Sequence, residues 1–162
     1  MSKSCAGTCK SSLRVDLFCS DRAISATSPQ PYFRIVNAGT VPFPLSSLSL
    51  HYYYSKGLSE DESFDCYNVS GGGCSLLAPA VFADVARKTP TADRYLELRY
   101  ASKASSLAVN QTSEIQGAFH VPSYAPFIQT DDYSFSNSNV FQSSVRVTLY
   151  ANGVLIWGTE PR

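Results

Sequence analysis

The sequence predicts an all-β sandwich of about nine short antiparallel strands in one domain. Short segments alternate apolar and polar residues, which is typical of strands with one buried face. Turn-forming residues separate these segments at short intervals, as in sandwiches and jelly rolls. We find no heptad pattern and no helix longer than a turn or two. The chain has 162 residues, enough for one domain with a real core.

Most of the expected strands are defined by this alternation and by β-rich composition. The segment at 79–86 is also rich in alanine, so its residues are compatible with a helix as well. In chain order the expected strands cover residues 13–19, 32–37, 48–54, 63–66, 79–86, 94–100, 109–120 and the two arms of a hairpin within 145–158. A long aromatic loop is expected over 123–139.

Two of these segments show which side chains should face the core. Successive side chains of a strand point to opposite faces of the sheet. In the segment 48–54, the inward set is Leu48, Leu50, Tyr52 and Tyr54, and the outward set is Ser49, His51 and Tyr53. In the segment 94–100, the inward set is Leu96, Leu98 and Tyr100, and the outward set is Tyr95, Glu97 and Arg99.

The strongest local signal is the hairpin at 145–158. Asn152 and Gly153 both tolerate a positive φ, as a type I′ turn requires. A two-residue turn fixes the register and would place Tyr150 opposite Leu155, and Thr148 opposite Trp157. The single Trp lies on an apolar strand, so we expect its ring to anchor the core.

Composition argues against several classes of partner. Thirteen basic residues balance thirteen acidic ones, whereas nucleic-acid binding demands a basic patch. No apolar run is long enough to span a membrane, and no signal peptide is visible. We therefore expect an excised domain of a secreted or extracellular protein, with residues 1–12 as leader or linker. A chain rich in Tyr and Ser and poor in charge suits a neutral, hydroxylated ligand.

The five cysteines are ambiguous. Cys66 and Cys74 flank a glycine-rich loop and could close it with a disulfide. Cys5 and Cys9 have the spacing of half a zinc site, but no second ligand pair is suitably spaced. An odd count leaves at least one cysteine unpaired in a monomer. The sequons beginning at Asn68 and Asn110 could be glycosylated if a eukaryote secretes the chain.

The search for catalytic motifs indicates that the chain is not an enzyme. It has no G-x-S-x-G elbow and no phosphate-binding glycine motif, and its carboxylates are scattered. Tyr53 and Tyr95 instead lie on the outward faces of their strands, with Glu97 beside Tyr95. Aromatic rings stack on sugars and carboxylates accept from hydroxyls, so this set could contact a carbohydrate. It could equally cover neighbouring side chains on a solvated sheet.

Seven motifs, taken together and in order, resemble those of family 3 carbohydrate-binding modules, the cellulose-binding domains of bacterial cellulases and cellulosome scaffolds. They are L-R-V-D-L-F at 13–18, P-Y-F-R-I-V-N-A-G at 31–39, L-S-S-L-S-L-H-Y-Y-Y at 45–54, A-D-R-Y-L-E at 92–97, I-Q-G at 115–117, D-D-Y-S-F at 131–135 and N-G-V-L-I-W-G-T-E-P at 152–161. The resemblance implies a jelly-roll β-sandwich over residues 13–162.

The resemblance also implies a non-catalytic module. Such a module binds cellulose or a related β-glucan and tethers an attached enzyme or scaffold to it. Two alternatives remain open. The first is a structural or sensing module of a wall or spore coat. The second is an accessory module that does not bind cellulose and packs against a catalytic domain.

Family members bind cellulose along a flat face with a strip of aromatic and polar residues. By resemblance the principal aromatic position falls on Tyr124, and an aspartate–histidine pair falls on Tyr67 and Asn68. The strip's arginine falls on Ala118, and Phe127 could assist. This shortened strip implies weaker binding, or a preference for amorphous cellulose or soluble β-glucan. A glycan on Asn68 would obstruct the same face.

The resemblance implies two further sites. A shallow groove on the opposite face, which could hold a linker peptide or a single glycan chain, is expected at His51, Tyr53, Tyr95, Glu97 and Tyr133. A calcium site joining two loops is expected at Ser55, Asp131 and Asp132, with the family's other loop carboxylate falling on Gly57. Calcium prefers several oxygen ligands, which these side chains could supply in part.

Overall fold

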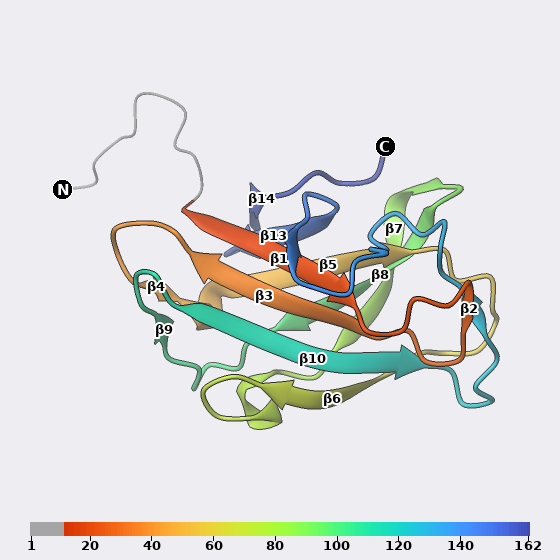
Figure 1. Ribbon diagram of the computed structural model, residues 1–162, viewed down its shortest axis with the longest axis horizontal. Helices are drawn as coiled ribbons and strands as arrows, with labels where there is room; N and C mark the ends of the chain where they lie inside the picture. The colour runs from red at the N-terminus through yellow and green to blue at the C-terminus, as the bar shows by residue number, and fades with distance from the viewer. Residues whose placement is uncertain (1–11) are drawn as a thin grey trace.

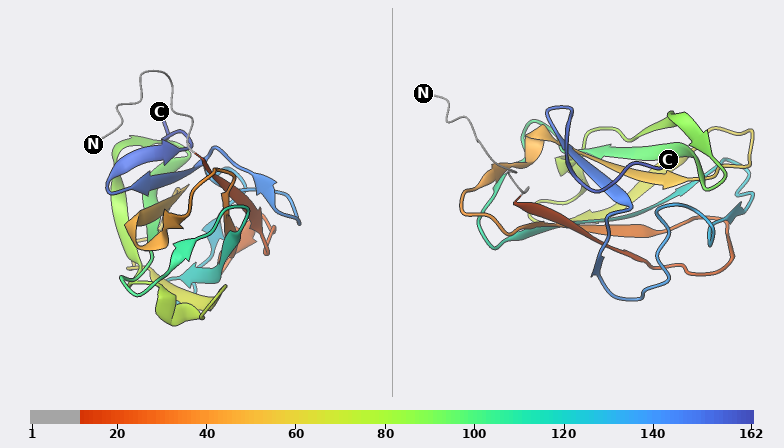
Figure 2. Two further views of the ribbon diagram at one scale, coloured as in Figure 1. Left: turned by 90° about the vertical axis from the view of Figure 1, so that its left-hand side faces the viewer. Right: turned by 90° about the horizontal axis from the view of Figure 1, so that it is seen from above.

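The computed structural model describes residues 12–162 and shows two antiparallel sheets packed face to face (Figures 1 and 2). The first has the strand order β12 (Gln142–Ser143), β1 (Leu13–Cys19), β3 (Pro31–Asn37), β10 (Thr112–His120) and β6 (Ser63–Val69). The second has the order β14 (Val154–Trp157), β13 (Val147–Ala151), β5 (Leu48–Tyr54), β8 (Ala92–Arg99) and β7 (Val81–Thr89).

Short elements complete the fold. Two two-stranded sheets pair β2 (Ser25–Ala26) with β11 (Phe127–Ile128), and β4 (Phe43–Pro44) with β9 (Ser106–Leu107). Two 3₁₀ turns, η1 (Leu45–Ser47) and η2 (Cys74–Leu76), lie before β5 and after β6. Five of the fourteen strands have only two residues, which leaves nine longer ones. The all-β jelly-roll sandwich is therefore confirmed, and 79–86 belongs to a strand rather than a helix.

The core lies between the two sheets, where the alternation predicted it. All four inward side chains of β5 are at most 2% exposed. The inward side chains of β8, and Tyr100 just after it, are at most 5% exposed. They meet the inward side chains of the other sheet, among them Phe33 on β3 and Phe119 on β10, through tilted and edge-to-face ring contacts. Only the side chains on the outer faces of the two sheets remain available to contact a ligand.

The C-terminal hairpin has the expected turn and a different register beyond it. Asn152 and Gly153 both have positive φ, and Tyr150 pairs with Leu155 as predicted. An irregularity after Leu149 then shifts the ladder, so Trp157 pairs with Leu149 and not with Thr148. Trp157 packs on the rim of the core, partly buried, and its indole N–H donates to the Ser144 carbonyl.

Strand β6, at the edge of the first sheet, is three residues longer than predicted and reaches Val69. The register shifts opposite Gln116 and Gly117 of β10, where β6 carries one extra residue, Tyr67, in a bulge. Gly117 is required there, because a Cβ would lie 2.4 Å from the Phe64 ring and 2.6 Å from the Asp65 carbonyl oxygen. The predicted disulfide between Cys66 and Cys74 is formed and closes the loop after β6.

Some predictions concern parts of the chain that the structure does not describe. The leader or linker at 1–12 and the cysteines Cys5 and Cys9 fall almost entirely outside the described residues. Cys19 is a buried free thiol. Within 12–162, no helix is both long and apolar enough to cross a membrane.

Candidate functional site

The outer face of the first sheet holds two of the predicted flat-face aromatics. Tyr67 on edge strand β6 and Tyr124 in the turn after β10 are each 52% exposed. Asn68, also exposed, follows Tyr67. Partial burial raises the pKa of the Tyr67 phenol, and the fields of Tyr32, Asp65 and Tyr124 raise it further.

Tyr124 is supported by a residue that the sequence did not single out. Its ring stacks on the imidazole of His120, with 4.4 Å between centroids and 6° between planes. His120 Nε2 lies 3.0 Å from Asp65 Oδ2, and its Nδ1 lies 3.1 Å from the Val121 carbonyl oxygen. The imidazole is thus held from both sides, and it fixes the plane of the exposed phenol. Outward alternation along β10 was the one signal that could have pointed to His120.

One flat-face expectation needs correction. Phe127 is 1% exposed and packs against Phe119 and Tyr54, because the small β2–β11 sheet turns its side chain inward. It cannot contact a polysaccharide. Ala118, where the family's arginine would fall, is fully buried close to the β6 bulge.

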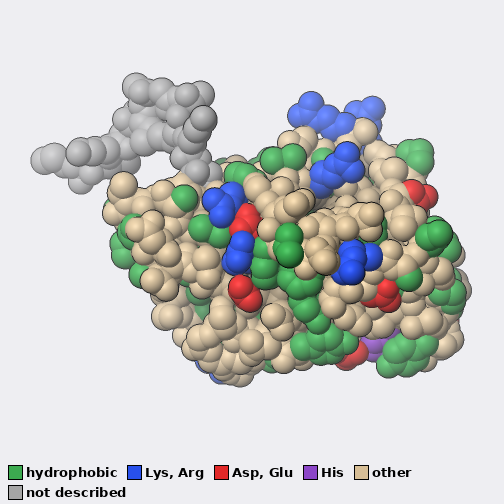
Figure 3. All heavy atoms as spheres, viewed as in Figure 1, with side chains coloured by type: hydrophobic (Ala, Val, Ile, Leu, Met, Phe, Trp, Pro, Cys, Tyr) green, Lys and Arg blue, Asp and Glu red, His purple; other side chains and the backbone are tan. Residues whose placement is uncertain are grey.

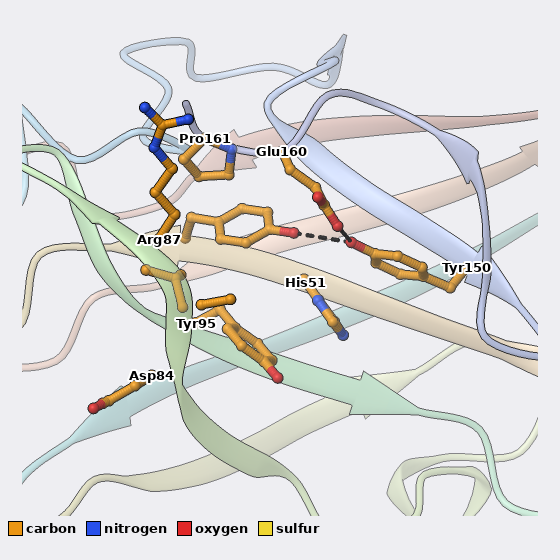
Figure 4. A pocket seen from close by; sticks show the side chains of 10 residues that line it. His51, Asp84, Arg87, Tyr95, Tyr150, Glu160 and Pro161 are labelled. Carbon is orange, nitrogen blue, oxygen red and sulfur yellow. Dashed lines mark hydrogen bonds between the residues drawn. The ribbon is translucent and has the colours of Figure 1, made fainter.

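The second sheet carries the predicted groove on its outer face, as a cavity of about 390 Å³ (Figure 4). His51 from β5 stacks on Tyr95 from β8, with 4.3 Å between centroids, and its Nε2 lies 2.8 Å from Glu97 Oε2. Burial lowers the pKa of His51, and the hydrogen bond with Glu97 opposes that shift. The cavity is lined by aromatic rings together with Asp84, Arg87 and Glu160, whereas Glu97 and Tyr133 of the predicted groove are not part of its lining.

Tyr53 is in the groove region but is not the exposed ring that alternation predicted. It is only 4% exposed, because Val85 from β7 and Tyr133 pack over it. Its hydroxyl makes hydrogen bonds with Thr148 Oγ1 at 2.7 Å and with the Tyr150 hydroxyl at 3.2 Å. Tyr53 forms the base of the groove rather than its wall.

The C-terminal segment closes one side of the groove, which sequence reasoning missed. The Tyr133 hydroxyl donates to the Thr159 carbonyl, and the Tyr150 hydroxyl donates to Glu160 Oε1. Figure 4 shows Glu160 and Pro161 beside Arg87 on this side, facing Tyr95 and His51. This side of the groove is formed by contacts between residues about ten or more positions apart in the sequence. No local sequence pattern could therefore predict it.

The loops of the expected calcium site contain a buried acid. Asp132 is 4% exposed and accepts a hydrogen bond from the Ser55 backbone N–H at 2.8 Å. Burial raises the pKa of Asp132 to about 8, and the nearby carboxylates of Asp131 and Asp93 add to this. Within residues 12–162 no three acidic, histidine or cysteine side chains converge closely enough to hold a metal by themselves. Hydroxyl and carbonyl oxygens would have to complete a calcium shell here.

Comparison with known proteins agrees with this architecture. A family of proteins described as "Cellulose binding domain" matches residues 14–158. A xyloglucanase from a Paenibacillus species is 31% identical over 151 residues, which are 93% of this chain and 14% of that protein. A family 3b module from the major scaffoldin subunit of Acetivibrio cellulolyticus superimposes with a TM-score of 0.87 at 34% identity, covering 93% of this chain and 97% of that one.

A biomass-sensing module from Clostridium thermocellum has the same TM-score, 0.87, at 27% identity, with 93% of this chain and 99% of that chain covered. The two-sheet fold with an aromatic outer face thus defines a non-catalytic carbohydrate-binding module. The chain belongs to the cellulose-binding-domain family, family 3 of these modules. It spans a small part of the xyloglucanase that it matches.

Proposed function

We propose that this module binds β-glucan chains through the outer face of the first sheet, with Tyr67, Tyr124 and Asn68 as contacts. The observation that carries the proposal is the pair of half-exposed tyrosines, one of them held by His120. Phenol rings stack on the apolar face of a sugar ring, and the amide of Asn68 can both donate to and accept from hydroxyls. Membership of the family supports the same ligand class.

The geometry favours amorphous cellulose or soluble β-glucan over crystalline cellulose. A crystal surface rewards a long strip of rings and hydrogen-bonding groups at fixed spacing. Here two positions of such a strip contribute nothing, since Phe127 and Ala118 are both buried. A shorter site suits a shorter or less ordered ligand.

The test is a pull-down on crystalline cellulose, amorphous cellulose and chitin with Tyr67→Ala and Tyr124→Ala. Losing one stacked ring should weaken binding to amorphous cellulose roughly two- to tenfold. Val154→Ala is the control, because Val154 is an exposed residue on β14 of the other sheet, outside the groove. Wild-type protein that is folded but binds none of the solids would refute the proposal.

In its parent protein the module would be secreted and would hold an attached catalytic domain or scaffold near the polysaccharide, raising its local concentration. Relatives that are parts of larger cellulosomal proteins support this role. The biomass-sensing module of similar fold favours a second candidate, in which the same face reports polysaccharide to a sensor. The groove offers a separate surface for a linker or a neighbouring domain.

Calcium is part of the proposal as a structural ion at the loops of Asp132. A buried carboxylate beside two other acids fits a cation, which would favour its ionised form. Asp132, Asp131 and Ser55 are the side chains that would hold it. Calcium should raise the melting temperature of the wild type and not of Asp132→Asn. An equal shift in both proteins would place the ion elsewhere.

A further inference from the structure

The outer face of the first sheet carries a row of rings that extends beyond the flat-face residues named above. Phe18 on β1 pairs directly with Tyr32 on β3. Phe141 directly precedes β12, whose Gln142 pairs with Leu17 of β1. The Phe18 ring packs edge-on against both neighbours, 5.1 Å from the Tyr32 centroid and 4.7 Å from the Phe141 centroid. Three rings from three adjacent segments therefore follow one line across the strands.

The row continues across the remaining strands as amides. The register of β3 with β10 places Gln116 beside Tyr32, and Gln116 pairs with Asn68 on β6. Tyr67 directly precedes Asn68 on the same strand. One rung of the sheet thus joins the predicted strip to three further rings. The rung crosses four gaps between neighbouring strands, so it is about 19 Å long. A row of that length has room for several sugar units.

The row is accessible to a ligand. Phe18, Tyr32, Phe141 and Gln116 are each partly exposed, and Asn68 is fully exposed. Figure 3 views this face and shows hydrophobic side chains, tyrosine among them, gathered in a band across its middle. Within the part of the chain that the structure describes, no segment is paired beyond the β6 edge of the sheet.

The charges beside the row are paired, which suits a neutral ligand. Asp16 binds Arg14 at 2.7 Å and Arg34 at 2.9 Å, and its carboxylate is nearly buried. Glu114 lies opposite Arg34 in the register of β3 with β10. The Arg34 guanidinium lies 4.4 Å from the Phe141 ring centroid. Two acids and two arginines balance, so the surroundings of the row offer no net charge to attract an ion.

We propose that this row is a second segment of the binding face and takes a single, non-crystalline β-glucan chain. The ring of Phe18 is turned 72° from Tyr32 and 79° from Phe141. Rings at such angles cannot all stack on one crystal plane, whereas an isolated chain can twist to follow them. The amides of Gln116 and Asn68 can donate to and accept from its hydroxyls. This inference rests on the proposed function, and it assigns Tyr32 as a contact residue.

The experiment measures binding of Tyr32→Ala to amorphous cellulose by depletion and to cellohexaose by calorimetry. Losing the ring should weaken both roughly two- to tenfold, while binding to crystalline cellulose changes little. Tyr32→Phe keeps the ring and should bind like the wild type. Val154→Ala, which shortens an exposed side chain on β14 of the other sheet and outside the groove, is the control and should also bind like the wild type.

The outcomes separate this inference from the proposed function. Wild-type affinity in Tyr32→Ala, together with loss in Tyr124→Ala, would overturn the second segment and leave the proposed function intact. Equal losses in Tyr32→Ala and Val154→Ala would also overturn it, since the two side chains lie on opposite sheets. A wild type that binds no glucan would refute the proposed function itself.

Discussion

The carboxylate of Asp132 lies in the interior beside two other acids, and no arginine or lysine of the described residues is ion-paired with it. A buried, unneutralised carboxylate destabilises the native state whenever it is ionised. Asp16, which is equally buried, is held by two arginines, and their hydrogen bonds lower its pKa against the effect of burial. The two aspartates show that partners, and not burial alone, decide the charge state.

We expect Asp132 to make stability depend on pH. Because its pKa is raised to about 8 in the folded state, the native protein binds a proton that the unfolded chain releases. Without calcium, the free energy of unfolding should therefore rise as the pH falls from about 8 towards about 4, the pKa of the carboxyl in the unfolded chain. Urea denaturation at several pH values measures this. Asp132→Asn should flatten the dependence, and an unchanged slope in that variant would contradict the assignment.

We also expect His120 to act on binding through Tyr124. Removing the imidazole in His120→Ala takes away a stacked ring contact of about 1 kcal/mol, so affinity for amorphous cellulose should fall about fivefold. His120→Phe restores a ring for Tyr124 to stack on and should recover most of the loss. Depletion binding assays measure both variants. Full affinity in His120→Ala would show that Tyr124 needs no support.

Edge strand β6 brings the most exposed binding residues to the rim of the sheet. It has a neighbour on one side only, so its end depends on the loop that follows it. The Cys66–Cys74 disulfide closes that loop, and η2 packs against the strand. The turn holding Tyr124 leans on the same strand through Asp65. β6 therefore controls both halves of the predicted strip.

Replacing Cys66 and Cys74 together by serine should lower the free energy of unfolding by about 2–3 kcal/mol. The disulfide restricts the unfolded chain, and it fixes the end of β6 next to Tyr67. Urea denaturation of the variant, and of wild-type protein treated with a reductant, should give similar midpoints. Cys19 is a buried free thiol in both proteins, so it does not contribute to any difference between them. Unchanged stability in both would show that the loop is held by packing alone.

At the level of the complete fold, the absence of net charge determines how binding should respond to salt. Thirteen positive and thirteen negative side chains leave a formal net charge of zero. Binding by stacking and neutral hydrogen bonds is not screened by salt. We expect the affinity for amorphous cellulose to change less than about twofold between about 50 and 500 mM NaCl. A steep fall in affinity with salt would indicate that ionic contacts dominate.

The strands and the core follow from local periodicity, which is why about nine short strands could be predicted. What the sequence alone missed depends on contacts between distant segments. Tyr53 alternates as an outward residue, yet Val85 and Tyr133 cover it. Phe127 lies in an aromatic loop, yet a two-residue strand turns it into the core. For the binding face, the resemblance located Tyr67 and Tyr124, whereas His120 and Tyr32 needed the register and the ring contacts.

A Cβ at position 117 would clash with the Phe64 ring and the Asp65 carbonyl, so this position requires glycine. One methyl group at this position would push the edge strand away from β10, and the outermost amide and phenol would leave the line formed by the inner rings. The close approach of β6 to β10 therefore requires a hydrogen atom, and not a methyl group, on the Cα of Gly117. If the proposed binding face is correct, substitutions at its contact residues would change affinity, whereas a substitution at Gly117 would change the length of glucan that the face can hold.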